Sequence, residues 1–445
     1  MTFKDKRALV VGMKKSGMAS VSLLVRGGAK VEATDLKPLE DLGQAGPILA
    51  GLEVPFARQT PEVFRGRDLI VLSPDVPADL PPLEEARRQG TKVIGEVELA
   101  SPFLKGRTIG ITGSNGKTTT TSLIGHLLKE GGLAVQVGGN IGTPVTAMID
   151  SSREDGWNVL ELSSFQLETI ECFRANIGLA LNVTQNHLDR HHTFERYAAA
   201  KGRLFENMQA EDLAVLNAAD PVCGEYAEHT KARVEWFNRA ATVRERSSAS
   251  LNDGALTLHG QFLIAASEIA IRGRHNIENI LAASLAAACA GLSHESIAAG
   301  VRTFRAVEHR LEFVRNVNGI DFYNDSKATS VDATLKAVDA FGGNLWVILG
   351  GKDKGLDYTA LRSPLAAKAK AALLIGAAAG KIAGQLAGAV RIENAKTLDQ
   401  AIALAFGEAK PGDTVLLAPA CASFDQFRSF EHRGEVFKHL VNELN

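Results

Sequence analysis

Runs of consecutive apolar residues recur along the chain, and stretches with helical periodicity separate them. Such runs form most of residues 7–11, 157–162 and 177–183, and each of these segments is bounded by glycine or polar residues. Continuous apolar runs of this kind are typical of parallel strands that are buried on both faces. Helical periodicity follows at residues 18–26 and 194–208. The alternation predicts an α/β fold built from doubly wound, mostly parallel sheets.

The strand-and-helix units fall into three groups, and 445 residues are too many for one ordinary core. We therefore predict three domains, at residues 1–97, 98–305 and 306–445. The first and last groups indicate Rossmann-like domains, and the middle group indicates a P-loop mononucleotide-binding domain. A hairpin at residues 312–323 is expected near the start of the last domain. The irregular pattern at residues 234–271 predicts no function.

Composition narrows the possible classes of function. The chain has 49 basic and 51 acidic residues, so no net field attracts nucleic acid or an anionic membrane surface. No apolar run is long enough to span a bilayer or to form the core of a signal peptide. The four cysteines are isolated, which indicates free thiols in a reducing compartment rather than a zinc site. We expect a soluble cytoplasmic protein whose function depends on specific sites.

The segment RTIGITGSNGKTTTT, at residues 107–121, predicts a phosphate-binding loop between a strand and a helix. Backbone N–H groups and the positive end of the helix dipole would together bind a polyphosphate. Lys117 would reach the β- and γ-phosphates, and the Thr118 hydroxyl would face a bound Mg²⁺. The loop is a variant, because Ile111 stands where the usual pattern has its first glycine. The alternative is an ordinary strand-to-helix turn that contains Gly-Lys-Thr.

Polar side chains follow the next two buried strands. Glu161 lies near the end of one strand, where a carboxylate beside a phosphate loop could bind Mg²⁺, although an exposed glutamate at a strand end is common. His187 comes soonest after the other strand and is the best candidate there to contact a metal ion. His191 and His192 are expected at the surface. Lys201 cannot bind a cation as an ammonium, so it is either structural or chemically modified.

The first glycine turn, residues 12–17, reads GMKKSG and departs from the dinucleotide fingerprint GxGxxG. A lysine stands where a pyrophosphate needs a bare backbone, so the evidence for NAD is weak. Asp35 falls near the usual ribose-binding position, and Lys14, Lys15 and Ser16 could hold phosphates from the side. These features favour a nucleoside diphosphate, and an α/β domain without a nucleotide remains the alternative.

Further polar segments follow strands in the remainder of the chain. GRHNIEN contains Asn276 and Asn279 on one helical face, where they either bind a nucleotide or cap the helix. In the last domain, NDSKATS, GGKDK and PACASFDQF each follow a predicted strand. Loops at the carboxyl ends of parallel strands commonly carry binding residues. We therefore expect a second binding edge in this domain.

Seven segments occur in an order and spacing that resembles the Mur ligase family over essentially the whole chain: GSNGKTT, LELSSFQLE, NHLDRH, GRHNIEN, EHR, NDSKAT and ACASFDQF. The phosphate loop is similar in folylpolyglutamate synthases, so it indicates only the reaction class. SSFQLE, NDSKAT and ACASFDQF resemble the member of the family that adds D-glutamate. The resemblance implies an N-terminal domain for a UDP-sugar, a central domain for ATP, and a C-terminal domain for the amino acid and part of the ATP site.

The resemblance also implies roles for individual residues, with ATP and Mg²⁺ as cofactors. The implied catalytic residues are Lys117, Glu161, His187 and Lys201. The implied metal ligands are Thr118, Glu161, His187 and Lys201, the last as a carbamate. The implied ATP contacts are Gly113, Ser114, Asn115, Gly116, Lys117, Thr118, Thr119, Asn279, Arg310, Asp325 and Lys327. The implied contacts to the UDP-substrate are Ser16, Asp35, Lys37, Asn140 and His187. The implied contacts to D-glutamate are Thr329, Lys354, Ser423 and Phe430.

Two departures from the family pattern concern the implied metal site. Asn186 stands where an acidic residue often precedes the metal histidine, and the segment from His187 to Lys201 is about one residue shorter than expected.

The implied reaction is the ATP-dependent ligation of D-glutamate to UDP-N-acetylmuramoyl-L-alanine through an acyl phosphate, which supplies peptidoglycan precursors. We expect a monomer without nucleic-acid or membrane partners. The alternatives are a dehydrogenase, a nucleotide-regulated binding protein, another Mur ligase and a folylpolyglutamate synthase.

Overall fold

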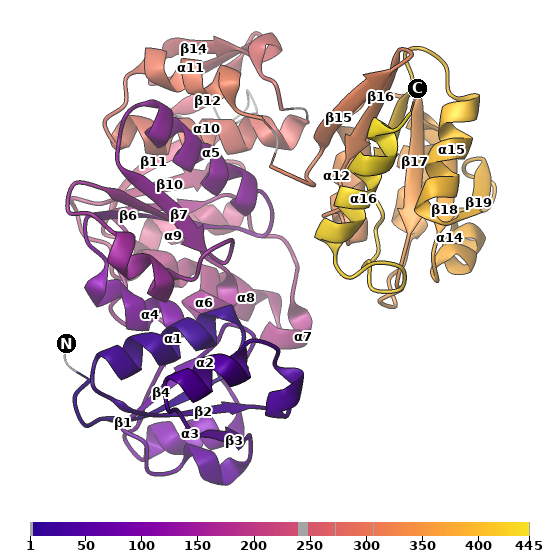
Figure 1. Ribbon diagram of the computed structural model, residues 1–445. Helices are drawn as coiled ribbons and strands as arrows, with labels where there is room; N and C mark the ends of the chain where they lie inside the picture. The colour runs from indigo at the N-terminus through magenta and orange to yellow at the C-terminus, as the bar shows by residue number, and fades with distance from the viewer. Residues whose placement is uncertain (1–2, 239–247, 272, 306, 445) are drawn as a thin grey trace. The chain divides into compact units, whose positions relative to one another are not determined.

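The computed structural model of the protein describes residues 3–238, 248–271, 273–305 and 307–444. The chain forms two compact units, one of Met1–Ser267 with Glu278–Val301 and one of Glu268–Ile277 with Arg302–Asn445. The first unit contains a five-stranded and a nine-stranded sheet, and the second contains a six-stranded sheet (Figure 1). Three sheets of mainly parallel strands, each packed against helices, confirm the predicted α/β fold class. The domain boundaries at residues 97 and 305 stay predictions.

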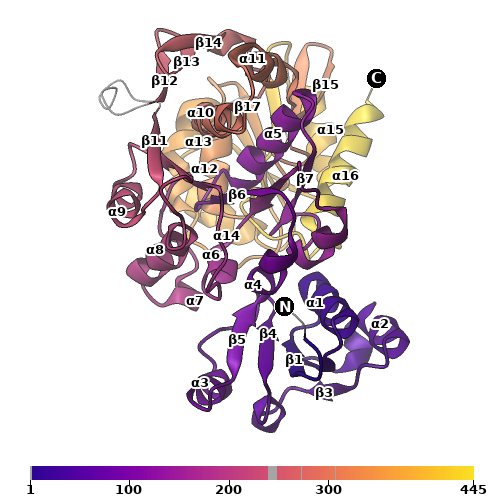
Figure 2. The same ribbon diagram turned by 90° about the vertical axis from the view of Figure 1, so that its left-hand side faces the viewer.

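The first sheet is parallel and has the strand order β3-β2-β1-β4-β5. Alternate residues of β1 contribute to two separate apolar clusters, so α1 and α2 cover one face of the sheet and α3 covers the other (Figure 2). The elements are β1 Arg7–Val11, α1 Lys15–Arg26, β2 Lys30–Asp35, α2 Ala45–Gly51, β3 Phe56–Arg58, β4 Leu69–Leu72, α3 Pro81–Arg88 and β5 Lys92–Gly95.

The nine-stranded sheet has the order β14-β13-β12-β11-β10-β9-β6-β8-β7. In this spatial order, all neighbouring strands from β12 to β7 pair in parallel, and the antiparallel strands β13 and β14 extend one edge. Its strands are β6 Arg107–Thr112, β7 Val135–Gly139, β8 Trp157–Glu161, β9 Ile177–Ala180, β10 Leu213–Asn217, β11 Arg233–Asn238, β12 Ala249–Asn252, β13 Ala255–Leu258 and β14 Gln261–Ala265. Its helices are α4 Glu96–Ala100, α5 Lys117–Glu130, α6 Ser164–Leu167, α7 Leu188–His191, α8 Phe194–Gly202, α9 Pro221–His229, α10 Arg274–Cys289 and α11 His294–Thr303.

The six-stranded sheet has the order β15-β16-β20-β17-β18-β19. β15 and β16 form the expected antiparallel hairpin. The neighbouring strands from β16 through β20, β17 and β18 to β19 pair in parallel. One apolar cluster holds α12, α13 and α14 on one face, and a second holds α15 and α16 on the other. The elements are β15 Glu312–Val317, β16 Ile320–Asn324, α12 Val331–Asp339, β17 Leu345–Gly350, α13 Arg362–Lys368, β18 Ala369–Ile375, α14 Ala379–Leu386, β19 Ile392–Lys396, α15 Leu398–Glu408, β20 Thr414–Leu417 and α16 Phe430–Asn442.

The order of the nine-stranded sheet determines which loops meet. β6 lies between β9 and β8, so the segments that follow these three strands emerge side by side at one edge. In parallel α/β sheets, ligands bind outside the carboxyl ends of such strands. Among the residues that the structure describes, no helix is long and apolar enough to cross a membrane.

Candidate phosphate and metal site

The phosphate-binding loop, residues 113–116, joins β6 to α5 through two glycines with positive φ. Gly113 has φ of 149° and Gly116, the residue before α5, has φ of 86°. A Cβ on Gly116 would lie 2.3 Å from Oδ1 of Asn279, so only glycine fits at this position. Asn279, a predicted ATP contact, therefore lies directly against the backbone of this loop.

Residues that follow β9 hold this loop in place. Asn182 accepts a hydrogen bond from Ser114 N at 2.8 Å through its carbonyl oxygen and another from Asn115 N at 2.9 Å through Oδ1. The Ser114 hydroxyl donates to the carbonyl of Thr184 at 3.0 Å and lies 2.9 Å from the hydroxyl of Tyr197. The contacts of Asn182 and Thr184 to this loop were not predicted from the sequence. Their position directly after a buried strand was the available signal.

The first turn of α5 points two polar side chains toward the site. Nζ of Lys117 donates to the carbonyls of Gly113 at 2.7 Å and Ser114 at 3.1 Å, so the ammonium lies against the loop. Thr118 Oγ1 donates to Oε2 of Glu161 at 2.8 Å. Thr119, also predicted as an ATP contact, is nearly buried on the same turn. The loop lysine and the hydroxyl beside it thus both lie at the phosphate-binding loop, and their roles toward ATP and Mg²⁺ stay predictions.

Glu161 ends β8 as a buried carboxylate, with 2% of its surface exposed. It is therefore no ordinary exposed residue at a strand end. Its Oε1 accepts a hydrogen bond from Nδ2 of Asn140 at 2.8 Å, and its carbonyl accepts one from Asn140 N at 2.8 Å. Asn140, predicted to face the UDP-substrate, thus also orients the carboxylate. Glu161 presents oxygen atoms between Thr118 and Asn140, directly beside the phosphate-binding loop.

Lys201 lies on α8 with 1% of its surface exposed. Its Nζ donates to the carbonyl of Gly113 at 2.9 Å and lies 4.7 Å from the centre of the Tyr197 ring. Burial lowers the pKa of Lys201 well below its usual value, and the charge of Lys117 lowers it further, whereas the Glu161 carboxylate opposes the shift. The neutral amine is therefore favoured, which is the form that reacts as a nucleophile.

His187 directly precedes α7 and has a left-handed backbone, with φ of 53°. Its exposed ring lies 5.0 Å from the ring of Phe165 and 6.4 Å from that of Tyr197, between centroids. His192 is exposed, as expected. The expectation for His191 was wrong, because its ring is 3% exposed. Its two nitrogens lie 2.9 Å from Ser164 Oγ and 3.0 Å from a carboxylate oxygen of Glu168, so burial leaves neither nitrogen without a partner.

The four predicted metal ligands gather at this edge of the sheet. Thr118 contacts Glu161, Lys201 contacts the loop at Gly113, and His187 lies beside Tyr197. Within the described ranges, no group of three or more histidine, cysteine, aspartate or glutamate side chains could hold a metal ion by itself. A hydroxyl and a buried carboxylate next to a phosphate-binding loop suit Mg²⁺, which commonly takes few protein ligands and completes its shell with phosphate oxygens and water. The residues present therefore fit this ion.

A separate cavity of about 260 Å³ lies at the carboxyl ends of β1 and β4 in the first sheet. Asp35 lines it and accepts hydrogen bonds from Met13 N at 2.7 Å and Lys37 N at 3.0 Å. Lys14 also lines the cavity, but its described lining includes neither the predicted Ser16, which lies on α1, nor Lys37. The glycine turn after β1 and the segment after β4 thus form the walls of a pocket beside Asp35.

In the second unit, predicted residues gather at the carboxyl ends of β16 and β20. Asp325 directly follows β16, and burial raises its pKa to about 7 against the opposing charge of Arg310. Nζ of Lys327 lies 3.8 Å from the centre of the Phe430 ring. The structure therefore brings together a predicted ATP contact and a predicted D-glutamate contact.

The remaining predicted D-glutamate contacts lie in three loops of this unit. Thr329 donates its backbone N–H to the carbonyl of Lys327 at 2.8 Å, Ser423 is buried after β20, and Lys354 is exposed after β17. The sequence analysis missed Arg433, which is fully buried and donates to Ser326 Oγ at 2.9 Å and to the carbonyl of Cys421 at 3.2 Å. This arginine ties two of these loops together.

Comparison with known proteins identifies related domains along the chain. The N-terminal domain described as "Mur ligase MurD-like" matches residues 6–95, the Mur ligase middle domain matches residues 111–287, and the Mur ligase glutamate ligase domain matches residues 309–421. Among solved structures, the UDP-N-acetylmuramate-alanine ligase MurC of Thermotoga maritima is 18% identical, with a TM-score of 0.62, over 98% of this chain and 99% of that chain. At this identity the likeness concerns the fold.

Two relatives are much more similar in sequence, and both are UDP-N-acetylmuramoylalanine--D-glutamate ligases. The protein of Solibacter usitatus is 71% identical over 444 residues, which cover 100% of this chain and 99% of the relative. The protein of Acidobacterium capsulatum is 51% identical over 449 residues, which cover 99% and 97%. The resemblance that the sequence motifs suggested is thus confirmed over the full length. The chain belongs to the UDP-N-acetylmuramoylalanine--D-glutamate ligases of the Mur ligase family.

Proposed function

We propose that this protein catalyses the ATP-dependent ligation of D-glutamate to UDP-N-acetylmuramoyl-L-alanine and releases ADP and phosphate. The observation that carries the proposal is the hydrogen bond from Thr118 to the buried carboxylate of Glu161 beside the loop of Lys117. The N-terminus of a helix, an ammonium, a hydroxyl and a carboxylate in this arrangement favour phosphoryl transfer from a nucleoside triphosphate. The two relatives named above support the choice of acceptor and amino acid.

The proposed reaction has two steps. An oxygen of the L-alanyl carboxylate attacks the γ-phosphorus of ATP, the bond to ADP breaks, and an acyl phosphate forms. The amine of D-glutamate then attacks the acyl carbon and loses a proton, and phosphate leaves with the former carboxylate oxygen. Lys117 and the first backbone N–H groups of α5 would stabilise the negative charge that spreads over the transferred phosphoryl group.

Mg²⁺ at this site would neutralise phosphate charge, and Thr118, Glu161 and His187 are the residues that we propose to hold it. We further propose that Lys201 carries a carbamate. The burial of this amine and its lowered pKa support the proposal, because the neutral form of an amine adds to CO₂ and releases a proton. The carbamate would replace the neutral amine by an anion with oxygen ligands, which suits a site that must hold Mg²⁺.

The test is the release of ADP from Mg-ATP in the presence of UDP-N-acetylmuramoyl-L-alanine. D-glutamate is compared with L-glutamate, with meso-diaminopimelate and with no amino acid. Release that requires both the UDP-sugar and D-glutamate is the expected result. Turnover with another amino acid would keep the reaction class and overturn the D-glutamate assignment. If no amino acid gives turnover, the proposed activity is wrong.

A further inference from the structure

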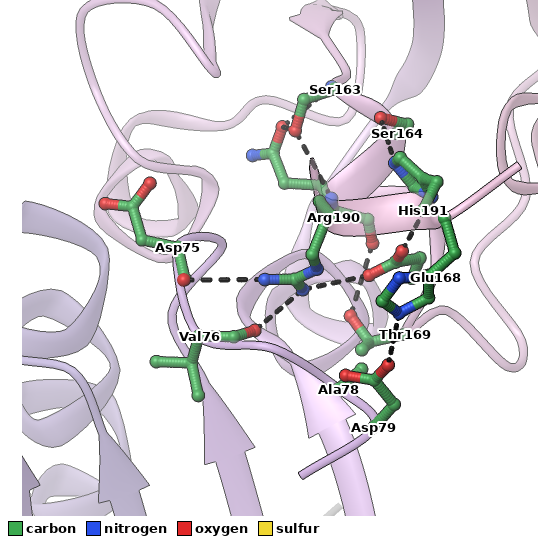
Figure 3. A network of polar contacts seen from close by, with 12 residues as sticks. Asp75, Val76, Ala78, Asp79, Ser163, Ser164, Glu168, Thr169, Arg190 and His191 are labelled. Carbon is green, nitrogen blue, oxygen red and sulfur yellow. Dashed lines mark hydrogen bonds and ion pairs between the residues drawn. The ribbon is translucent and has the colours of Figure 1, made fainter. Parts of the chain in front are cut away.

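Arg190 joins two domains of the first unit through a nearly buried guanidinium group (Figure 3). Its Nη2 donates to the carbonyl of Val76 at 2.8 Å and to Oε2 of Glu168 at 2.9 Å, and its Nη1 lies 3.4 Å from the carbonyl of Asp75. Only 11% of its side chain is exposed, and the guanidinium lies over the Phe165 ring at 4.9 Å from its centre. One side chain therefore bridges the segment after β4 and the segment after α6.

The carboxylate of Glu168 contacts the side chains of two neighbouring residues of the short helix α7. One carboxylate oxygen accepts from Arg190, and the other lies 3.0 Å from Nδ1 of His191. The opposite ring nitrogen of His191 lies 2.9 Å from Oγ of Ser164, the first residue of α6. Since α6 follows β8 almost directly, these contacts fix α7 relative to the strand that ends at Glu161.

The other end of this link is a wall of the cavity beside Asp35, the proposed site of a nucleoside diphosphate, which we call the nucleotide pocket. Asp75 and Val76 line the 260 Å³ cavity beside Asp35. Val76 N donates to the carbonyl of Ser73 at 3.0 Å, and the Ser73 hydroxyl donates to the carbonyl of Gly12 at 2.6 Å. Continuous polar contacts thus run from the glycine turn after β1 to the guanidinium of Arg190.

His187 depends on the same helix. Its carbonyl accepts hydrogen bonds from Arg190 N at 3.1 Å and His191 N at 3.0 Å. Its left-handed backbone, with φ of 53°, is uncommon for residues other than glycine. A helix of four residues has little rigidity of its own, so the side-chain contacts of Arg190 and His191 set its position.

We infer that Arg190 and Glu168 are positioning residues, which hold His187 in place and couple it to the wall of the nucleotide pocket formed by Asp75 and Val76. The inference rests on the proposed function. Binding of a nucleoside diphosphate group and orientation of the histidine then depend on one buried ion pair. A bidentate guanidinium suits this task, because it spans two carbonyls and a carboxylate in fixed geometry.

The test uses Arg190→Gln and Glu168→Gln, with two control variants from the same region. Arg196→Gln removes an exposed arginine that lines a second cavity together with Arg190 and Glu168. Asp79→Asn removes an exposed partner of His192. UDP binding is measured by titration calorimetry, and kcat and the KM for D-glutamate are measured by ADP release. Both test variants should weaken UDP binding about tenfold and lower kcat on the order of 10²-fold, with the KM for D-glutamate unchanged. The controls should match the unmodified protein.

A double-mutant cycle separates positioning from general stability. If Arg190 acts through His187, Arg190→Gln should lower kcat far less in a His187→Ala background than in the unmodified protein. Arg190→Lys should recover most of the urea unfolding midpoint without recovering kcat, because lysine keeps the charge but cannot span both sides. Additive losses in the cycle, or recovery of kcat by lysine, would overturn the inference.

Failure of the inference is distinguishable from failure of the proposed function. Turnover of the unmodified protein with D-glutamate tests the function, whereas UDP binding needs no turnover. If the unmodified protein turns over and Arg190→Gln binds UDP as Arg196→Gln does, the link is wrong and the function stands. If the unmodified protein does not turn over, weaker UDP binding by Arg190→Gln and Glu168→Gln still supports the link, and unchanged binding rejects it.

Discussion

Oγ1 of Thr118 lies 2.8 Å from Oε2 of Glu161 and donates a hydrogen bond to it, which joins the first turn of α5 to the carboxyl end of β8. A hydroxyl that donates its proton to a carboxylate can still bind a cation through an oxygen lone pair, so this contact orients both groups toward the same ion. The contact therefore couples the phosphate-binding loop to the proposed Mg²⁺ site.

Thr118→Val should remove this coupling and lower kcat by a factor on the order of 10²–10³. The concentration of Mg²⁺ needed for half-maximal rate should rise, and both quantities follow from ADP release at varied Mg²⁺. Thr121→Val is the matched control, because Thr121 lies on the same helix with a buried hydroxyl that has no hydrogen-bond partner among the described residues. Equal losses in the two variants would show that the hydroxyl of Thr118 has no special role.

Gly116→Ala should abolish nucleotide binding, because its Cβ would lie 2.3 Å from Oδ1 of Asn279 at a residue with φ of 86°. The control is Gly132→Ala, since Gly132 has φ of 79° but open space where its Cβ would stand. Both variants should lose about 1–2 kcal/mol of unfolding free energy from the left-handed backbone. Calorimetric titration with ADP should show lost affinity only for Gly116→Ala. Unchanged ADP affinity there would contradict the proposed role of the loop.

Lys201 should form a carbamate when CO₂ is supplied. Burial lowers the pKa of Lys201, which favours the neutral amine that reacts with CO₂, so protein prepared without CO₂ should lose activity and regain it with bicarbonate. A carbamate resonance should appear by NMR after incubation with ¹³C-labelled bicarbonate, and Lys201→Met should lack it. Activity that is independent of CO₂, together with no such resonance, would rule the modification out.

Glu96 should make the stability of the protein depend on pH. Its Oε1 accepts hydrogen bonds from N and Oγ1 of Thr146, at 2.6 and 2.9 Å, while its buried Oε2 has no partner in the ranges that the structure describes. Burial raises the pKa of Glu96 from 4.5 to about 7. The folded protein therefore keeps a proton that the unfolded chain releases in this window, so stability is full below it and falls as the pH rises through it.

The measurement is urea unfolding of the unmodified protein and of Glu96→Gln. Between about pH 5 and about pH 8, the unfolding free energy of the unmodified protein should fall by about 2–3 kcal/mol relative to that of the variant. Other titrating groups cancel in this difference. Parallel pH profiles for the two proteins would mean that the carboxyl ionises normally when folded.

Local sequence patterns predicted those parts of the site that depend on neighbours in the chain. The glycines, Lys117 and Thr118 lie within one strand-loop-helix unit, and Glu161 closes the adjacent strand, so sheet topology alone brings them together. The hairpin of β15 and β16 followed from alternation over a short segment. These features needed no knowledge of distant contacts.

Contacts between distant segments escaped the sequence analysis. The guanidinium of Arg190 meets Val76 across a separation of 114 residues, and nothing near either residue indicates the pairing. His191 was expected at the surface because histidine is polar, yet two hydrogen-bonding partners make its burial favourable. Hydrogen-bond partners of this kind come from segments that are distant in the chain, so a local sequence pattern does not predict them.

The antiparallel strands β13 and β14 have a consequence for how this sequence can evolve. They lie at the edge of the nine-stranded sheet, and β9, β10, β11 and β12 separate them from β6. Residues inserted or deleted in the turn between β13 and β14 would leave the register of β6 and β8 unchanged. Lineages that descend from this sequence should therefore vary in length at this edge, while the spacing from Gly113 to Lys201 stays nearly constant.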